Sequence, residues 1–192
     1  MVVAEAVIFW IVVALLLRRD LGAIATRSFR GGWKLAALVV GLFLAQALIV
    51  LYVPGQTTLQ IATVIVSQVA VLGLAALNRH LPGAILFASG IALNTTVMAA
   101  NGGWMPITQE MYYFVHPERI AEVLSRPPTS KGIILPRSET NLWALSDIVP
   151  LPLPWRRTAV SIGDLLLIAG VGQFIMHASS RRRASLPVVG TQ

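Results

Sequence analysis

Residues 35–77 have the sequence LAALVVGLFLAQALIVLYVPGQTTLQIATVIVSQVAVLGLAAL, two long apolar runs separated by Pro54-Gly55-Gln56-Thr57. Each run approaches the ~20 apolar residues that an α-helix needs to cross a bilayer core of ~30 Å. The break between them carries no charged residue. This stretch therefore predicts two consecutive membrane-crossing helices, Leu35–Val53 and Leu59–Leu77.

The same apolar pattern recurs elsewhere, in Val2–Leu17, Leu81–Ala100 and Ile162–Met176. The chain of 192 residues is 56% hydrophobic and only 12% charged, whereas a soluble domain carries about 25% charged residues. A charged group at the bilayer centre costs ~2.5–3.5 kcal/mol or more, so lipid exposure favours this composition. We therefore expect an all-α fold, a polytopic transmembrane bundle of five spans within residues 1–178.

The charges alternate between the connections of these spans. Residues 18–34, residues 78–80 and the C-terminal tail are basic, whereas residues 54–57 are neutral and residues 101–159 mix both signs. Basic loops stay in the cytoplasm, so we expect the N-terminus outside and the C-terminus inside. Arg18 and Arg19 follow the first apolar run rather than precede it, which is not the layout of a cleavable signal. The net charge of +7 thus reports membrane topology, and no nucleic-acid partner is expected.

Residues 101–159 are expected to form an ordered cap on the outer face. Thr108-Gln109-Glu110 is typical of a helix start, and Pro117-Glu118 predicts a second short amphipathic helix to about Leu124. A third is possible near Asn141–Leu145. The alternating leucines and prolines of residues 148–155 favour an extended path.

Residues 179–192 are expected to be a disordered, basic cytoplasmic tail. Its Arg181, Arg182 and Arg183 set the topology and can also bind anionic lipid. Small residues recur every fourth position in two spans, at Ala37, Gly41 and Ala45 and at Ala84, Ala88, Ala92, Thr96 and Ala100. Such faces let helices approach closely. We expect them to pack inside the bundle, and an interface with another subunit is the alternative.

Several polar residues are expected to meet near the outer ends of the spans. An outer-leaflet pocket for an ion, a headgroup or a small polar ligand is the functional interpretation, since ionisable groups at this depth are functional candidates. Structural interpretations stand beside it: Ser161 and Asp164 match a capping box, Asn94 can bond across helices, Asp147 can end a turn, and Glu5 can be solvated. The candidate residues are Glu5, Asn94, Asn101, His116, Asp147 and Asp164.

Other chemistries find no support in the sequence. The chain has no cysteine, which excludes disulfides, thiolate catalysis and cysteine metal sites. Its three histidines, His80, His116 and His177, are scattered over both expected faces of the membrane. No nucleophile elbow, phosphate-binding loop or zinc-protease motif is present. We expect no cofactor, no metal and no catalytic residue.

Two blocks of sequence resemble a known family. The first runs from Asn78-Arg79-His80-Leu81-Pro82-Gly83 through Asn94 to Asn101-Gly102-Gly103-Trp104-Met105-Pro106. The second joins residues 142–152, LWALSDIVPLP, to Ser161-Ile162-Gly163-Asp164. In content, order and spacing they resemble the bacterial membrane-protein family called domain of unknown function 5317. The resemblance implies a polytopic protein of the bacterial inner membrane and brings no activity with it.

Three functions remain open at this point. We favour a non-enzymatic accessory or scaffold subunit of a larger membrane complex, with lipid and other membrane proteins as partners. A transporter or channel for an ion or small solute is an alternative that rests on the outer polar residues. A membrane enzyme acting on lipid or quinone is the third, and it would need convergent acid and base groups.

Overall fold

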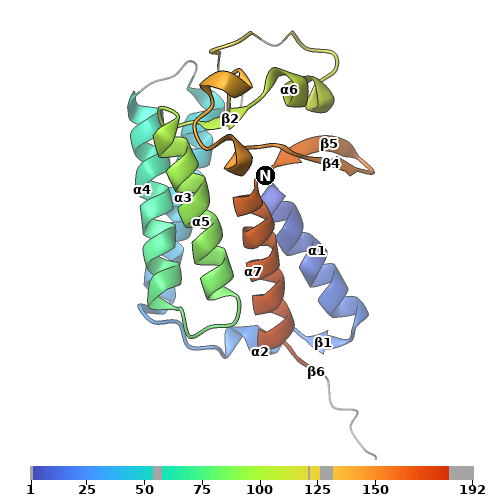
Figure 1. Ribbon diagram of the computed structural model, residues 1–192. Coiled ribbons are helices and arrows are strands. Elements are labelled where there is room, and N and C mark those ends of the chain that lie inside the picture. The colour runs from blue at the N-terminus through green and yellow to red at the C-terminus, as the bar shows by residue number, and fades with distance from the viewer. Residues whose placement is uncertain (1, 54–57, 121, 126–131, 182–192) are drawn as a thin grey trace, which may run out of the picture.

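The computed structural model describes residues 2–53, 58–120, 122–125 and 132–181, and it is mostly helical (Figure 1). Its long helices coincide with the five apolar stretches: α1 (Val2–Leu16), α3 (Gly32–Tyr52), α4 (Thr58–Leu77), α5 (Ala84–Ala100) and α7 (Ile162–Ala178). Only α3 and α4 are long and apolar enough to cross a membrane by themselves in the described chain. This is fewer than the five spans expected, because α1, α5 and α7 hold 15, 17 and 17 residues.

The long helices stand side by side in the order α1, α7, α5, α4 and α3, and each packs mainly on the next. The first and last helices of this row, α1 and α3, therefore have one main neighbour each. Chain reversals are made by residues that favour them: Gly31 and Gly83, both with positive φ, precede α3 and α5. After α5, the N–H of Gly103 bonds to the carbonyl of Met98 at 2.7 Å, which closes the helix with a glycine turn.

The closest packing joins α5 to α7 through glycines on both helices. A Cβ atom on Gly90 would lie 2.5 Å from the Gly163 carbonyl oxygen, and one on Gly170 would lie 2.7 Å from the Phe87 nitrogen. No side chain fits there, so glycine allows the two backbones to touch. Farther along α7, Trp10 of α1 fills the space beside Gly172, and its indole N–H donates to the Ile168 carbonyl at 3.1 Å.

The predicted rows of small residues do not make these contacts. On α3, Ala37, Gly41 and Ala45 are exposed, and nothing in the described part of the chain lies within 4 Å of the Cβ position of Gly41. Packing of this row inside the chain was therefore a wrong prediction, because α3 stands at the end of the row of helices. On α5, the predicted row is half-buried from Ala84 to Ala92 and exposed at Thr96 and Ala100.

One end of the bundle carries short elements that hold the basic residues against α7. The guanidinium of Arg19 donates to the carbonyls of Met176 at 2.6 Å and Ser179 at 3.1 Å, and that of Arg27 donates to Ala178 at 3.3 Å. These cations satisfy the free carbonyls at the negative end of the helix. The elements here are β1 (Arg19–Asp20), α2 (Gly22–Ala25) and β6 (Ser180–Arg181), with β1 and β6 antiparallel. Arg182, Arg183 and the rest of the expected tail lie outside the described residues.

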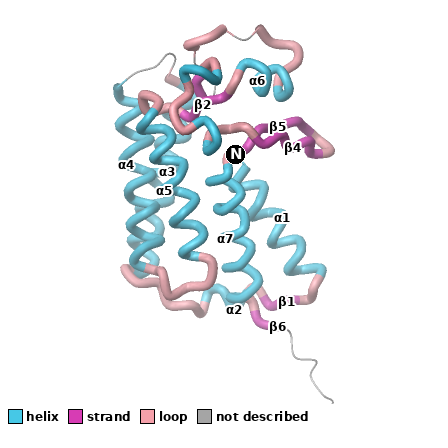
Figure 2. Tube along the Cα trace, in the orientation of Figure 1, coloured by secondary structure: helices cyan, strands magenta, loops and turns pink. Residues whose placement is uncertain are grey.

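The opposite end of the bundle is covered by the cap, residues 101–160 (Figure 2). It contains β2 (Met105–Ile107), α6 (Gln109–Val115), β3 (Gly132–Ile134), the 3-10 turns η1 (Arg137–Glu139) and η2 (Trp143–Leu145), β4 (Val149–Leu153) and β5 (Arg156–Val160). Strands β2 and β3 are parallel, and β4 and β5 form an antiparallel hairpin. The all-α expectation is thus corrected: cap segments that are far apart in sequence satisfy their backbone groups by pairing.

The expected short helices of the cap have mixed outcomes. Helix α6 is confirmed, with the Thr108 side chain accepting from the Met111 N–H at 3.3 Å. The prediction of a second short helix that runs to about Leu124 is wrong in the described residues. Leu124 and Ser125 form backbone hydrogen bonds with Ile134 of β3 instead. The third is a 3-10 turn, η2. The leucine–proline segment is extended as predicted. In β4 its exposed prolines alternate with half-buried valine and leucine residues.

Candidate functional site

The junction of α5 and α7 holds three of the polar side chains in one hydrogen-bonded group. The Asn94 amide donates to the Asp164 carboxylate at 2.8 Å, and its oxygen accepts from the Ser161 hydroxyl at 2.8 Å. The Ser161 hydroxyl in turn accepts from the backbone N–H of Asp164 at 3.0 Å. Ser161 and Asn94 are both buried. The group therefore holds the second half of α5 against the beginning of α7.

Local sequence explains why these side chains meet. Ser161 has extended backbone and caps α7, as the capping pattern predicted. Gly163 then leaves room for the Asn94 side chain, which a Cβ atom at that position would strike. Asp164 lies in the first turn of α7, where the positive end of the helix favours a carboxylate. The expected bond of Asn94 across helices is confirmed, and its partner carboxylate is the one predicted to cap the helix.

Asp147 lies next to this group, in the turn between η2 and β4. Its backbone N–H donates to the Pro106 carbonyl at 3.2 Å. The residue is half-buried, but its Oδ1 atom is fully buried and has no hydrogen-bond partner in the described chain. Burial, and then the negative charge of Asp164, raise the pKa of Asp147 well above its usual value, while the positive charge at the start of the chain opposes them. Asp147 is thus the candidate residue best placed to hold a proton.

Asn101 serves a structural bond between the bundle and the cap. Its amide donates to the carbonyls of Val97 at 2.7 Å and Asn141 at 2.9 Å, and its oxygen accepts from the Asn141 N–H at 2.9 Å. The Asn141 amide returns a bond to the Ala100 carbonyl at 2.9 Å. The Asn101 side chain therefore binds the backbone of Asn141, and the Asn141 side chain binds the carbonyl of the residue before Asn101. Both polar atoms of the Asn101 side chain are engaged in these bonds.

Glu5 is paired rather than solvated. Its two carboxylate oxygens accept from Arg156 Nε at 3.1 Å and from a terminal nitrogen of Arg156 at 2.7 Å. Both side chains are about one-third exposed, at 30% for Glu5 and 34% for Arg156. This bidentate pair joins the first turns of α1 to strand β5 of the cap.

His116 does not join the other candidates. It ends α6, with its ring near that of Tyr112, and its Nδ1 lies 3.8 Å from the Glu118 carboxylate. Partial burial, and then the charge of Arg119, lower the pKa of His116, and Glu118 partly offsets them. The six predicted residues thus divide into the Asn94–Asp164 group with Asp147 beside it, and three separate sites.

Sequence reasoning missed the partners that complete these sites, Asn141 and Arg156. No spacing rule could find them, because Asn141 lies 40 residues from Asn101 and Arg156 lies 151 residues from Glu5. Within the described ranges, no group of three or more His, Asp or Glu side chains could hold a metal ion. Chemically, the site offers one buried carboxyl beside a hydrogen-bonded carboxylate.

Comparison with known proteins gives one match. No curated protein and no solved structure matches the chain significantly. Residues 28–176 match the model of a family described as "Family of unknown function (DUF5317)", and this range runs from before α3 to Met176 in the last turn of α7. It includes every candidate residue except Glu5. The chain therefore belongs to the DUF5317 family, a family of unknown function.

Proposed function

We propose that this protein crosses a bacterial inner membrane five times and serves as a non-enzymatic subunit of a larger membrane assembly. The most apolar windows of α3 and α4 are only 17% and 22% buried within the chain. The core helix of a soluble protein would be mostly buried, so lipid is the better partner for these surfaces. Helices α5, α7 and α1 continue the same row beyond α4, and the 17 residues of α5 or α7 extend about 25 Å at ~1.5 Å per residue.

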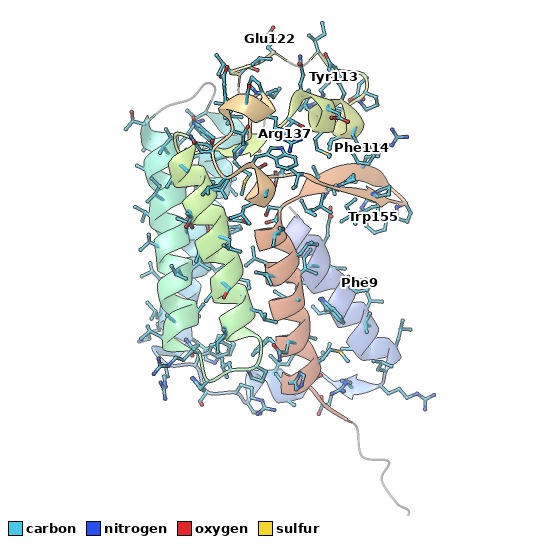
Figure 3. The ribbon with its side chains drawn as sticks, viewed as in Figure 1. Phe9, Tyr113, Phe114, Glu122, Arg137 and Trp155 are labelled. Carbon is cyan, nitrogen blue, oxygen red and sulfur yellow. The ribbon has the colours of Figure 1, made fainter. Side chains whose placement is uncertain are left out.

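Exposed apolar side chains support this placement. Large hydrophobic residues cover the outside of both end helices, among them Ile8, Phe9 and Leu16 on α1 and Leu38, Leu44 and Leu48 on α3. Figure 3 shows Phe9 on α1 and Trp155 at the turn of the β4–β5 hairpin. Trp155 is 68% exposed at the level of the cap, where indole rings favour the membrane–water interface.

The positions of charge support an orientation with the cap outside. Arg19, Arg27 and Arg30 lie at the end of the bundle opposite the cap, and the beginning of α1 lies at the cap end. Basic residues are retained on the cytoplasmic side. The charges of Arg181, Arg182 and Arg183 support the proposal that the end of the chain binds anionic lipid.

The single observation that carries the subunit proposal is the uncovered row Ala37, Gly41 and Ala45 on α3. These small side chains face outward at the end of the helix row, with open space at Gly41. Lipid tails gain little packing energy against such small side chains, whereas another helix can approach them closely. The polar candidates Asn94, Asn101 and Glu5 are meanwhile engaged in structural bonds, which favours a scaffold over catalysis.

A photocrosslinking amino acid at Leu44, next to this row, tests the proposal in intact cells. The proposal expects a discrete adduct with a different membrane protein, and Gly41→Phe should abolish it. Gly73→Phe on α4 is the matched control, since Gly73 also has nothing within 4 Å. A photocrosslinking probe at the exposed Val12 of α1 tests the opposite end of the row of helices. Adducts with lipid alone, or only with a second copy of this chain, would contradict the proposal.

Asp147 favours a second candidate function, the movement of protons or another cation. A buried carboxyl without a partner, beside a second carboxylate, is a common feature of ion pathways. Flux into proteoliposomes that is lost in Asp147→Asn and retained in Glu139→Gln, on the exposed face of the cap, would support this function. Equal flux in protein-free vesicles would reject it.

A further inference from the structure

The cap contains a cleft that none of the candidate residues above lines. It has a volume of about 420 Å³ and lies between the first turn of α6, η1 and η2. Apolar walls come from Met111, Pro136 and Ile148, and Glu110, Arg137 and Trp143 also line it. Figure 3 shows Arg137 inside the cap, beside α6. A volume of this size suits a small molecule or a headgroup.

Arg137 is held in the cleft by an aromatic ring rather than by an acid. Its guanidinium carbon lies 3.8 Å from the centre of the Trp143 ring, a cation–π contact. Among the described residues Arg137 makes no ion pair, and it is exposed. Stacking occupies the face of the guanidinium and leaves the N–H groups at its edge. Those groups match the oxygens of a phosphate or carboxylate.

Glu110 places the opposite charge on the same cleft. It is exposed, and it forms no ion pair with Arg137 within 4.0 Å. Two opposite charges therefore border one space without neutralising each other. A ligand that carries both an anion and an ammonium group can satisfy both, with its short apolar link against Met111 and Ile148.

Trp143 supplies an independent sign that the site is incomplete. Its indole N–H is buried and has no hydrogen-bond acceptor in the described chain. Buried donors of this kind are almost always paired in folded proteins. An anionic oxygen held beside Arg137 would offer an acceptor to the ring on which Arg137 stacks.

We propose that this cleft binds a phosphoethanolamine group, with the phosphate at Arg137 and the ammonium at Glu110. The group has two sources, a lipid headgroup at the membrane surface or a soluble phosphorylated amine. The lipid source rests on the proposed membrane-spanning bundle, whereas binding of the soluble group depends only on the cap.

The test titrates the purified full-length protein, in detergent free of phosphoethanolamine lipid, with soluble O-phosphoethanolamine and follows binding by calorimetry. Inorganic phosphate and ethanolamine are the half-ligand probes. The proposal expects O-phosphoethanolamine to bind at least tenfold more tightly than either half. Arg137→Gln should weaken binding tenfold or more, and Glu110→Gln should remove the preference over phosphate. Arg119→Gln and Glu118→Gln, which replace exposed residues of the same cap, should change neither the affinity for O-phosphoethanolamine nor the preference over phosphate.

A second arm uses nanodiscs that contain either phosphatidylethanolamine or phosphatidylglycerol, with bound lipid read by native mass spectrometry. Retention of the first lipid that is lost in Arg137→Gln identifies the headgroup as the source. Binding of soluble O-phosphoethanolamine without retention of the lipid identifies a soluble phosphorylated amine as the source. No binding of either form, or binding unchanged in Arg137→Gln and Glu110→Gln, would overturn the site whatever the outcome for Leu44 crosslinking or for topology.

Discussion

The side-chain amide of Asn94 donates a 2.8 Å hydrogen bond to the carboxylate of Asp164, and this bond joins the second half of α5 to the first turn of α7. The same amide oxygen accepts from Ser161, so one residue connects the helix pair and the helix cap. Because Ser161 directly follows strand β5, the group also holds this strand of the cap to the bundle.

Replacing Asn94 by alanine should destabilise the protein by about 1–2 kcal/mol, since it leaves Ser161 and Asp164 without their shared partner. Thr95→Ala is the matched control, because the Thr95 hydroxyl is buried without a hydrogen-bond partner among the described residues, and its loss should cost little. Thermal unfolding in one detergent measures both variants. Equal melting temperatures for the two variants would show that the bond contributes nothing.

Gly163→Ala should be more damaging than the same change elsewhere. Its added methyl group would strike the Asn94 side chain and come within 2.8 Å of the Gly90 carbonyl, which forces α5 and α7 apart. Gly73→Ala on α4 meets nothing within 4 Å and should stabilise its helix by up to ~1 kcal/mol. Melting temperatures should therefore move in opposite directions, and a rise in both would contradict the close packing.

Asp147→Asn should stabilise the protein near neutral pH and have less effect in acid. The pKa of Asp147 is raised in the folded state above its ordinary value of 3.8, by burial and by the charge of Asp164. The stability that protonated Asp147 contributes is full below the ordinary value and is lost as pH rises through the raised value. The difference in melting temperature between the variant and the natural protein should therefore grow with pH and then level off. A difference that shrinks with rising pH would have the wrong sign.

Glu5 and Arg156 should be coupled by about 0.5–1 kcal/mol, the upper range for partly exposed ion pairs, because their contact is bidentate. A double-mutant cycle with Glu5→Gln and Arg156→Gln measures this energy. Loss of the pair should also make the β4–β5 hairpin more accessible to protease, whereas Arg157→Gln on the same strand should not. Additive effects of the two changes would mean that the pair is not formed in solution.

The long helices could be predicted because their signals are local. Apolar runs of membrane length give the elements, and Thr108 and Ser161 mark where α6 and α7 begin. The order of the helices could not be predicted, because helices that are apolar on every side have no single stripe that identifies a neighbour. The predicted packing of the small α3 residues inside the bundle was wrong for this reason. Their spacing shows that they share one face of the helix, but it does not show what packs on that face.

The cap was predictable as an ordered unit and not as a set of strands. Leu124 shows why, since its N–H bonds to Ile134 of β3 instead of continuing a helix. For the candidate site, the similar depth of Asn94 and Asp164 along two helices predicted that they lie near each other, but not that they bond. The Glu5–Arg156 pair depends on how the hairpin folds back over α1. The Arg137–Trp143 cleft had no sequence signal, because its walls come from three separate segments of the cap.

Cysteine labelling in intact cells tests the five-span topology most directly, and the natural chain has no cysteine to interfere. Ser138 of η1 in the cap and Ser28 before α3 are both exposed and lie at opposite ends of the bundle. We expect Ser138→Cys to react with a membrane-impermeant thiol reagent, and Ser28→Cys to react only after the cells are opened. Labelling of Ser28→Cys in intact cells, or equal labelling at both positions, would contradict an account in which the cap lies outside the membrane and the arginine-rich end inside.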